Sequence, residues 1–135
     1  MDKNILYKKF IDNKINCAIK YKLDNDSINK ILNNIDDDIF NNDNCVLWTG
    51  KIVSKNKGKS KYINFYFNKQ KIMLHRLLFI NYVKNIDKKQ YIKYTCDNKG
   101  ICCNINHMFI NEKDDNQDDI KEDEYKKFKK IKLKF

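Results

Sequence analysis

Several common features are scarce or missing in this chain of 135 residues. It contains no proline, three glycines, a single alanine and a single arginine. No apolar run approaches the roughly 20 residues of a membrane-spanning helix, so we expect no membrane partner. The first ten residues, MDKNILYKKF, mix charge with apolar side chains and lack the apolar core of a secretory signal. These absences predict an intracellular protein in a reducing compartment.

Lysine, asparagine and isoleucine are abundant instead, as is typical of a very AT-rich genome such as that of a large DNA virus or a low-GC microbe. For a viral protein, the compartment would be the host cytoplasm, the nucleus or the virion. The net charge of +10 and the pI near 9.3 favour a polyanionic partner, of which nucleic acid is the commonest. Because lysine codons are AT-rich, part of this charge reflects genome composition.

Hydrophobic spacing predicts three helices in the chain. Isoleucine and leucine recur at helical spacing over residues 27–39, where Asp26 or Ser27 would cap the first turn. A less regular helix is expected over about residues 4–20, and a buried helix from about His75 to Lys84. All three are expected to pack against the core.

Strand patterns fill the middle of the sequence. A strand is expected to start at Cys45, followed by the loop KNKGKSK with Gly58 at its turn and by the strand YINFYFN. A tight turn is expected at Asn68 and Lys69, and the short strand YIKYT leads to Cys96. Together with the helices, these elements predict an α+β fold.

Composition divides the chain into three parts. Residues 1–25 are expected to form an N-terminal helical extension and residues 26–120 the main domain. The polar segment 111–130 has acids early and lysines late, the order that a helix dipole favours. Residues 121–135 are expected to form a basic C-terminal helix or tail.

Cysteine and histidine gather in the stretch YTCDNKGICCNINH, which holds three of the five cysteines and one of the two histidines. Five residues separate Cys96 from Cys102, and four separate Cys102 from His107, so a loop can bring all three onto one ion. Cys45 would supply the fourth ligand from a distant strand. The pattern predicts a structural zinc site that supports a small core.

Two alternatives remain open at this point. Cys103 competes with Cys102 for the same ligand position. The cysteines could also be small buried residues and His107 a core histidine, and Cys17 in the first helical segment fits a packing role better than a ligand role.

The motifs resemble those of the His-Me finger endonucleases, in particular the HNH-like group with a zinc-binding loop related to the His-Cys-box homing endonucleases. The resemblance covers roughly residues 27–120. It rests on these motifs: CVLWTG from Cys45, Tyr62 thirteen residues before the HRL of His75, CDN from Cys96, and CCNINH ending at His107.

This resemblance implies a ββα-metal core, double-stranded DNA as partner, and a homodimer of the kind that relatives often form. It also implies Cys45, Cys96, Cys102 and His107 as the zinc ligands. One position departs from the family: Tyr94 stands where the family has its catalytic histidine, whereas Asn116 matches the asparagine that binds a divalent ion, Mg²⁺ or Mn²⁺.

The tyrosine weakens the expectation of catalysis. A phenol with a pKa near 10 is a poor general base at neutral pH, and losing a general base costs about 10²–10⁴-fold in rate. His75 could replace it as base or ligand if the fold brought it near Asn116. We therefore expect a zinc-stabilised DNA-binding protein whose nuclease activity is weakened or lost. The alternatives are an active divalent-metal-dependent DNA endonuclease, and a zinc-stabilised structural or interaction protein.

Two groups of basic residues are candidates for DNA contact. Arg76 carries the planar guanidinium that suits phosphate or guanine, although it could equally pair with a carboxylate at a helix start. Alternate lysines would form a basic hairpin able to enter a major groove, although charged hairpin tips are also simply solvated. They are Lys55, Lys57, Lys59 and Lys61.

Overall fold

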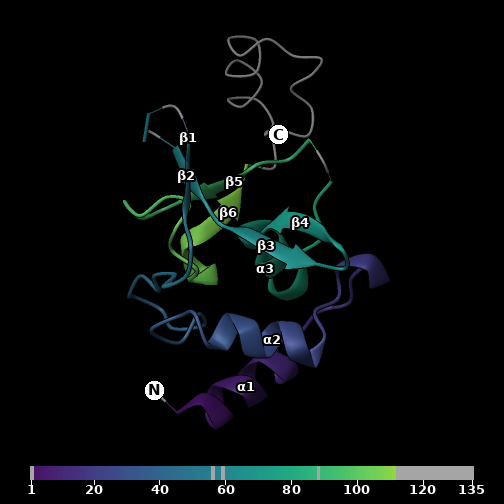
Figure 1. Cartoon of the computed structure of the whole chain (residues 1–135). Coiled ribbons are helices and arrows are strands. Elements are labelled where there is room, and N and C mark those ends of the chain that lie inside the picture. The colour runs from purple at the N-terminus through teal and green to yellow at the C-terminus, as the bar shows by residue number, and fades with distance from the viewer. Residues whose placement is uncertain (1, 56, 59, 88, 112–135) are drawn as a thin grey trace, which may run out of the picture.

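The computed structural model describes residues 2–55, 57–58, 60–87 and 89–111, and within them it is a mixed α and β structure (Figure 1). Short helices surround three antiparallel sheets of two strands each among these residues. The elements are α1 (Lys3–Asp12), the 3₁₀ helix η1 (Ile19–Tyr21), α2 (Asn25–Leu32), β1 (Val53–Lys55), β2 (Ser60–Tyr62), β3 (Asn64–Phe67), β4 (Gln70–Met73), α3 (Leu74–Tyr82), β5 (Ile92–Tyr94), η2 (Ile105–His107) and β6 (Met108–Ile110). The predicted α+β class is confirmed at this level.

The helix expected over 27–39 is shorter than its hydrophobic pattern suggests. Asp24, rather than Asp26 or Ser27, caps α2, and its carboxylate accepts a hydrogen bond from the backbone N–H of Ser27 at 2.8 Å. This contact lowers the pKa of Asp24. The helix ends at Leu32, because Ile35 leaves it to bridge with the backbone of Trp48. The later isoleucines are buried all the same.

The helix expected over 4–20 is also shorter, since α1 ends at Asp12. Asp2 caps its first turn through hydrogen bonds from two backbone N–H groups. Phe10 of α1 is fully buried and makes edge-to-face contacts with Phe40 at 5.4 Å and Tyr82 at 5.6 Å between ring centroids. The first helix therefore packs into the same core as α2 and α3.

The central hairpin and helix lie where the sequence predicts them, but the expected strand YINFYFN is divided between the end of β2 and β3, which belong to different sheets. β3 and β4 pair in antiparallel register, and the turn between them places Asn68 at φ 54° and Lys69 at φ 67°. Both residues are left-handed, as the twist of a two-residue hairpin turn requires. The chain then enters α3, whose residues are nearly all buried. This helix presents His75 and Arg76 from its first turn.

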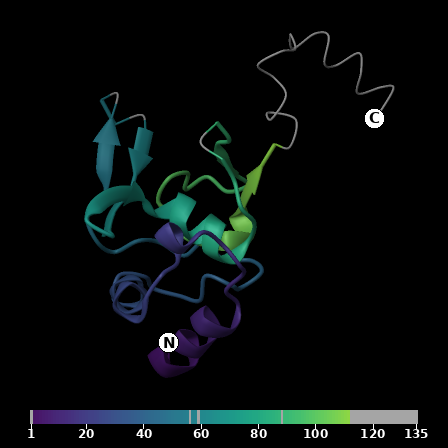
Figure 2. The ribbon, with the colours of Figure 1, turned by 90° about the vertical axis from the view of Figure 1, so that its right-hand side faces the viewer.

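A single continuous strand does not begin at Cys45. Leu47 instead makes an isolated bridge with Cys102, and regular pairing starts only at β1. The β1–β2 hairpin extends from the body at the end opposite α1 (Figures 1 and 2). Gly58 lies in its turn with φ 89°, as expected.

β5 and β6 pair antiparallel, with Tyr94 opposite Met108. The cysteine-rich stretch forms the connection between these strands. The ββα-metal core stays a prediction. The polar segment after Asn111 and the basic tail over 121–135 lie outside the described residues. Within the part of the chain that is described, no helix has the length and apolarity to cross a membrane.

Candidate metal centre

Four side chains from separate parts of the chain converge beside the β5–β6 pair. The ligand atoms of Cys45, Cys96, Cys102 and His107 all lie within 4.8 Å of one another. His107 Nδ1 lies 3.7 Å from Cys45 Sγ and 3.5 Å from Cys102 Sγ. With Zn–S bonds of about 2.3 Å and Zn–N bonds of about 2.0–2.1 Å, a tetrahedral site separates sulfur from nitrogen by about 3.6 Å. The cluster could hold a metal ion such as zinc.

Backbone and side-chain N–H groups surround the sulfur atoms. Asn98 Nδ2 donates to Cys45 Sγ at 3.2 Å. The backbone N–H groups of Val46 and Asn104 both donate to Cys102 Sγ at 3.4 Å. Such donors favour the thiolate form that a metal requires. They are the residues that spacing alone missed, although Asn98 follows Cys96 by two positions within CDN.

The three thiols differ in their acidity. The hydrogen bond from Asn98 lowers the pKa of Cys45. Burial raises the pKa of Cys96, and it raises the pKa of Cys102 to about 12. A thiol as buried as Cys102 needs a nearby cation to ionise at neutral pH, and a metal ion such as zinc would supply one. The donor set therefore fits a bound cation better than three free thiols.

The second nitrogen of His107 fixes the orientation of its ring. Nε2 donates to the backbone carbonyl of Asp43 at 3.2 Å. Because a carbonyl only accepts, the proton lies on Nε2 and the lone pair of Nδ1 faces the sulfur atoms. A backbone carbonyl in this place is the usual outer partner of a metal-bound histidine.

The structure places Cys102, and not Cys103, in the cluster. Consecutive side chains in extended backbone point to opposite sides, so Cys103 is directed into the hydrophobic core. Its backbone N–H donates to the Val46 carbonyl at 2.6 Å, which joins the loop to the segment after Cys45. Cys17 lies apart from the cluster, with its sulfur 3.9 Å from Asn81 Oδ1.

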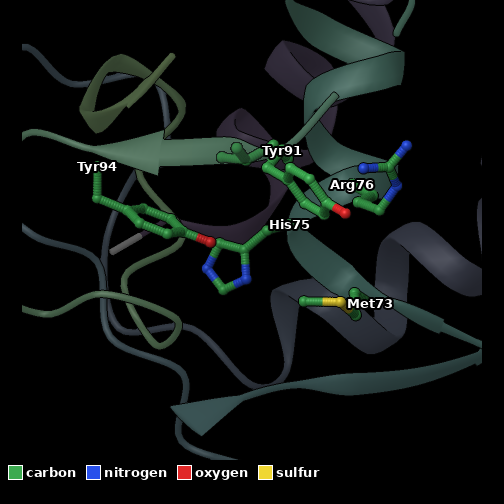
Figure 3. A pocket seen from close by; sticks show the side chains of 6 residues that line it. Met73, His75, Arg76, Tyr91 and Tyr94 are labelled. Carbon is green, nitrogen blue, oxygen red and sulfur yellow. The ribbon is translucent and has the colours of Figure 1, made fainter. Parts of the chain in front are cut away.

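Tyr94 and His75 lie side by side (Figure 3). Their rings pack edge to face, with centroids 5.4 Å apart. His75 Nε2 donates to the Cys102 carbonyl at 2.6 Å, and burial lowers the pKa of His75 to about 4. Burial and the nearby cysteines raise the pKa of Tyr94 to about 12, so the phenol is neutral at pH 7. Asn116 lies outside the described residues.

The basic candidates have different surroundings. Arg76 donates to the backbone carbonyls of Gln90 at 2.7 Å and Asp87 at 2.8 Å, so its partners here are carbonyls rather than a carboxylate. Lys55 and Lys61 lie on paired strands of the hairpin, and Lys57 lies in its turn with φ 58°. All three lysines are exposed. Lys59 lies outside the described residues.

One relative supports a viral connection. The chain is 42% identical over 106 residues to an uncharacterized protein of Acanthamoeba polyphaga mimivirus. The aligned region covers 77% of this chain. The matched region is 31% of that protein, so the chain spans about a third of the length of this curated relative. No protein-family model and no solved structure matches the chain. The viral relative agrees with the composition typical of an AT-rich genome.

Proposed function

We propose that the protein is a zinc-stabilised, HNH-like DNA-binding protein whose nuclease activity is weakened or lost. The β1–β2 hairpin carries this proposal, because it presents exposed lysines beside the candidate metal centre. Gly100, two residues before Cys102, has φ 82°, and a Cβ there would lie 1.8 Å from the carbonyl oxygen of Lys61. The loop that holds the metal ligands thus also supports the base of the hairpin.

Zinc is the metal that best suits the donor set. Three sulfur atoms and one imidazole nitrogen at tetrahedral spacing are typical of closed structural zinc sites. All four positions are protein ligands, so the ion would hold the fold together rather than activate water. A separate Mg²⁺ or Mn²⁺ ion would be needed for hydrolysis, and Asn116 is the residue proposed to bind it.

Double-stranded DNA is the proposed partner. A two-stranded ribbon is narrow enough to enter the major groove, and Lys55, Lys57 and Lys61 would meet the phosphates on either side. Lys55 Nζ also lies 5.0 Å from the centre of the Tyr62 ring. This cation–π contact holds the Lys55 side chain along the hairpin. The positive charge of these three lysines is concentrated on the β1–β2 hairpin, as binding in a DNA groove requires.

Salt dependence tests this surface. Replacing Lys55, Lys57 and Lys61 by alanine should reduce the slope of log K against log salt by about 3, because each lysine neutralises about one phosphate. The matched control replaces Lys8, Lys22 and Lys30, exposed lysines of the α1–α2 region, and should leave the slope unchanged. Binding of duplex DNA by neither wild type nor control at about 50 mM salt would favour the structural or interaction protein.

Weakened catalysis follows from the neutral phenol of Tyr94. A pKa of about 12 leaves the hydroxyl protonated, so it cannot take a proton from water at pH 7. Supercoiled plasmid with Mg²⁺ or Mn²⁺ should be nicked slowly or not at all by the wild type. Tyr94→His should gain cleavage if only the base is missing. Wild-type nicking that Asn116→Ala abolishes, with the fold unchanged, would instead establish the active endonuclease.

A further inference from the structure

A cavity of about 300 Å³ lies beside the start of α3, and none of the four candidate metal ligands lines it. It is lined by Met73, His75 and Arg76, from the end of β4 and the start of α3, and by Tyr91, Ile92 and Tyr94, in and just before β5. Figure 3 shows the hydroxyl end of Tyr94 directed toward the His75 ring. Most of the lining is apolar side chain, so the few polar atoms in it determine what the cavity can recognise.

His75 lines this cavity and has one buried ring nitrogen without a hydrogen-bond partner among the described residues. Its side chain is 1% exposed, and Nδ1 has no hydrogen-bond partner among the described residues. Because Nε2 donates to the Cys102 carbonyl, the proton is on Nε2 and Nδ1 of the neutral ring carries a lone pair. A buried polar atom without a partner is costly, so a ligand with an N–H group would gain by supplying one.

The other polar groups argue against a phosphate ligand here. The guanidinium of Arg76 is already donating to the carbonyls of Gln90 and Asp87. The neutral imidazole of His75 offers a lone pair, which repels an anion. Tyr91 is 69% exposed and presents a flat aromatic face at the edge of the cavity. An apolar, partly aromatic cavity with one buried acceptor suits a flat ring that carries an N–H donor.

We propose that this cavity binds one unpaired or extruded nucleobase of a nucleic-acid strand, recognised through an N–H group donated to His75 Nδ1 and stacked against Tyr91. The inference rests on the proposed DNA-binding function and specifies a second contact beyond the lysine hairpin. The Tyr94 hydroxyl, which is directed toward the His75 ring, would donate to an acceptor atom of the base. Each nucleobase carries an N–H donor next to an acceptor, whereas a phosphodiester carries only acceptors at neutral pH.

Mononucleotides test the cavity without requiring DNA binding. In protein labelled with ¹⁵N-histidine, millimolar adenosine 5′-monophosphate should shift the Nδ1 resonance of His75 and leave that of His107 in place. Purine riboside 5′-monophosphate, which lacks the exocyclic amine, should bind at least about fivefold more weakly. Equal binding of the two nucleotides, or an unchanged His75 Nδ1 resonance at millimolar nucleotide, would overturn the proposal.

A tyrosine pair tests the stacking contact. Tyr91→Ala should weaken binding of adenosine 5′-monophosphate at least about fivefold, since stacking of a base on an aromatic side chain is lost. Tyr66→Ala is the matched control, because Tyr66 is also exposed, at 59%, but does not line the cavity. Equal affinity of the Tyr91 variant and the control for adenosine 5′-monophosphate would refute stacking of the base against Tyr91.

Duplex DNA separates this inference from the proposed function. Wild type should prefer a duplex with one unpaired adenine over a fully paired one, and Tyr91→Ala should lose the preference while retaining salt-dependent binding. Salt-dependent binding without any preference would retain the hairpin and refute the base cavity. Nucleotide binding at His75 without DNA binding would retain the base cavity and refute DNA binding by the hairpin.

Discussion

At the scale of single residues, surroundings give two histidines opposite roles. His107 turns Nδ1 toward two sulfur atoms because the Asp43 carbonyl holds its other nitrogen. His75 turns Nε2 away from the cavity toward the Cys102 carbonyl and is buried without a carboxylate partner in the described chain. The ring chemistry is identical in both, so the hydrogen-bond partner decides which nitrogen remains available.

The buried His75 predicts a loss of stability in acid. Its pKa of about 4 in the folded protein lies below the value of about 6.5 in an unfolded chain, so the unfolded state binds more protons between these values. This residue should therefore contribute full stability above pH 6.5, and about 3 kcal/mol of it should be lost as the pH falls to 4.

Nuclear magnetic resonance measures this shift directly. The Cε1–H resonance of His75 should stay constant from pH 8 to about 5, whereas the same residue in urea-unfolded protein should titrate near 6.5. A midpoint of 6 or higher in the folded protein would contradict the buried, neutral ring.

At the scale of elements, the loop between β5 and β6 both carries candidate metal ligands and contacts β2. It carries Cys96 and Cys102, and at Gly100 it approaches the backbone of β2. Only a residue without a Cβ allows this approach, since the added atom would overlap the Lys61 carbonyl. The position of the basic hairpin is thereby coupled to the candidate metal centre.

A pair of glycine variants tests this coupling. Gly58 also has positive φ, at 89°, but a Cβ there would meet nothing within 4 Å. Gly58→Ala should show only the cost of the left-handed backbone, whereas Gly100→Ala should lower the free energy of unfolding by about 1–3 kcal/mol more. Urea denaturation measures both. Equal losses would mean that the loop and β2 are not in close contact.

At the scale of the whole molecule, the four candidate ligands join segments that are far apart in sequence. Cys45 follows the α2 region, whereas the other three lie around β5 and β6. An ion at this point would connect the two halves of the chain. Structural zinc sites contribute an apparent binding energy of about 10–16 kcal/mol, comparable to the whole stability of a small domain.

Metal removal is expected to unfold or strongly destabilise the protein. The purified chain should contain one zinc per molecule by elemental analysis, and a chelator should lower the melting temperature. Cys102→Ser should lose the zinc, whereas Cys103→Ala and Cys17→Ser should retain it, because their sulfur atoms lie outside the cluster. A metal-free protein with unchanged melting in chelator would contradict the metal centre.

Local chemistry made part of this structure predictable. Asn68 and Lys69 form the expected tight turn, because left-handed residues suit a two-residue hairpin. The apolar run after His75 forms a helix, and the spacing around Cys96 anticipates a cluster of sulfur and nitrogen donors. The turn and the helix depend on neighbours within a few residues, and three of the four donors lie between Cys96 and His107.

Tertiary packing decided the rest. Ile35 is buried like a helical residue but leaves the helix to pair with Trp48, because a long-range backbone bridge replaces the helical hydrogen bonds. Cys102 rather than Cys103 joins the cluster, because pairing with the segment after Cys45 leaves Cys103 directed into the core and Cys102 toward the other ligands. The cavity at His75 also depends on tertiary structure, because residues at the start of α3 and residues in β5 line it together. Amino-acid sequence alone determined which donors and turns this protein has, whereas the fold decided which of them meet, because those contacts join residues distant along the chain.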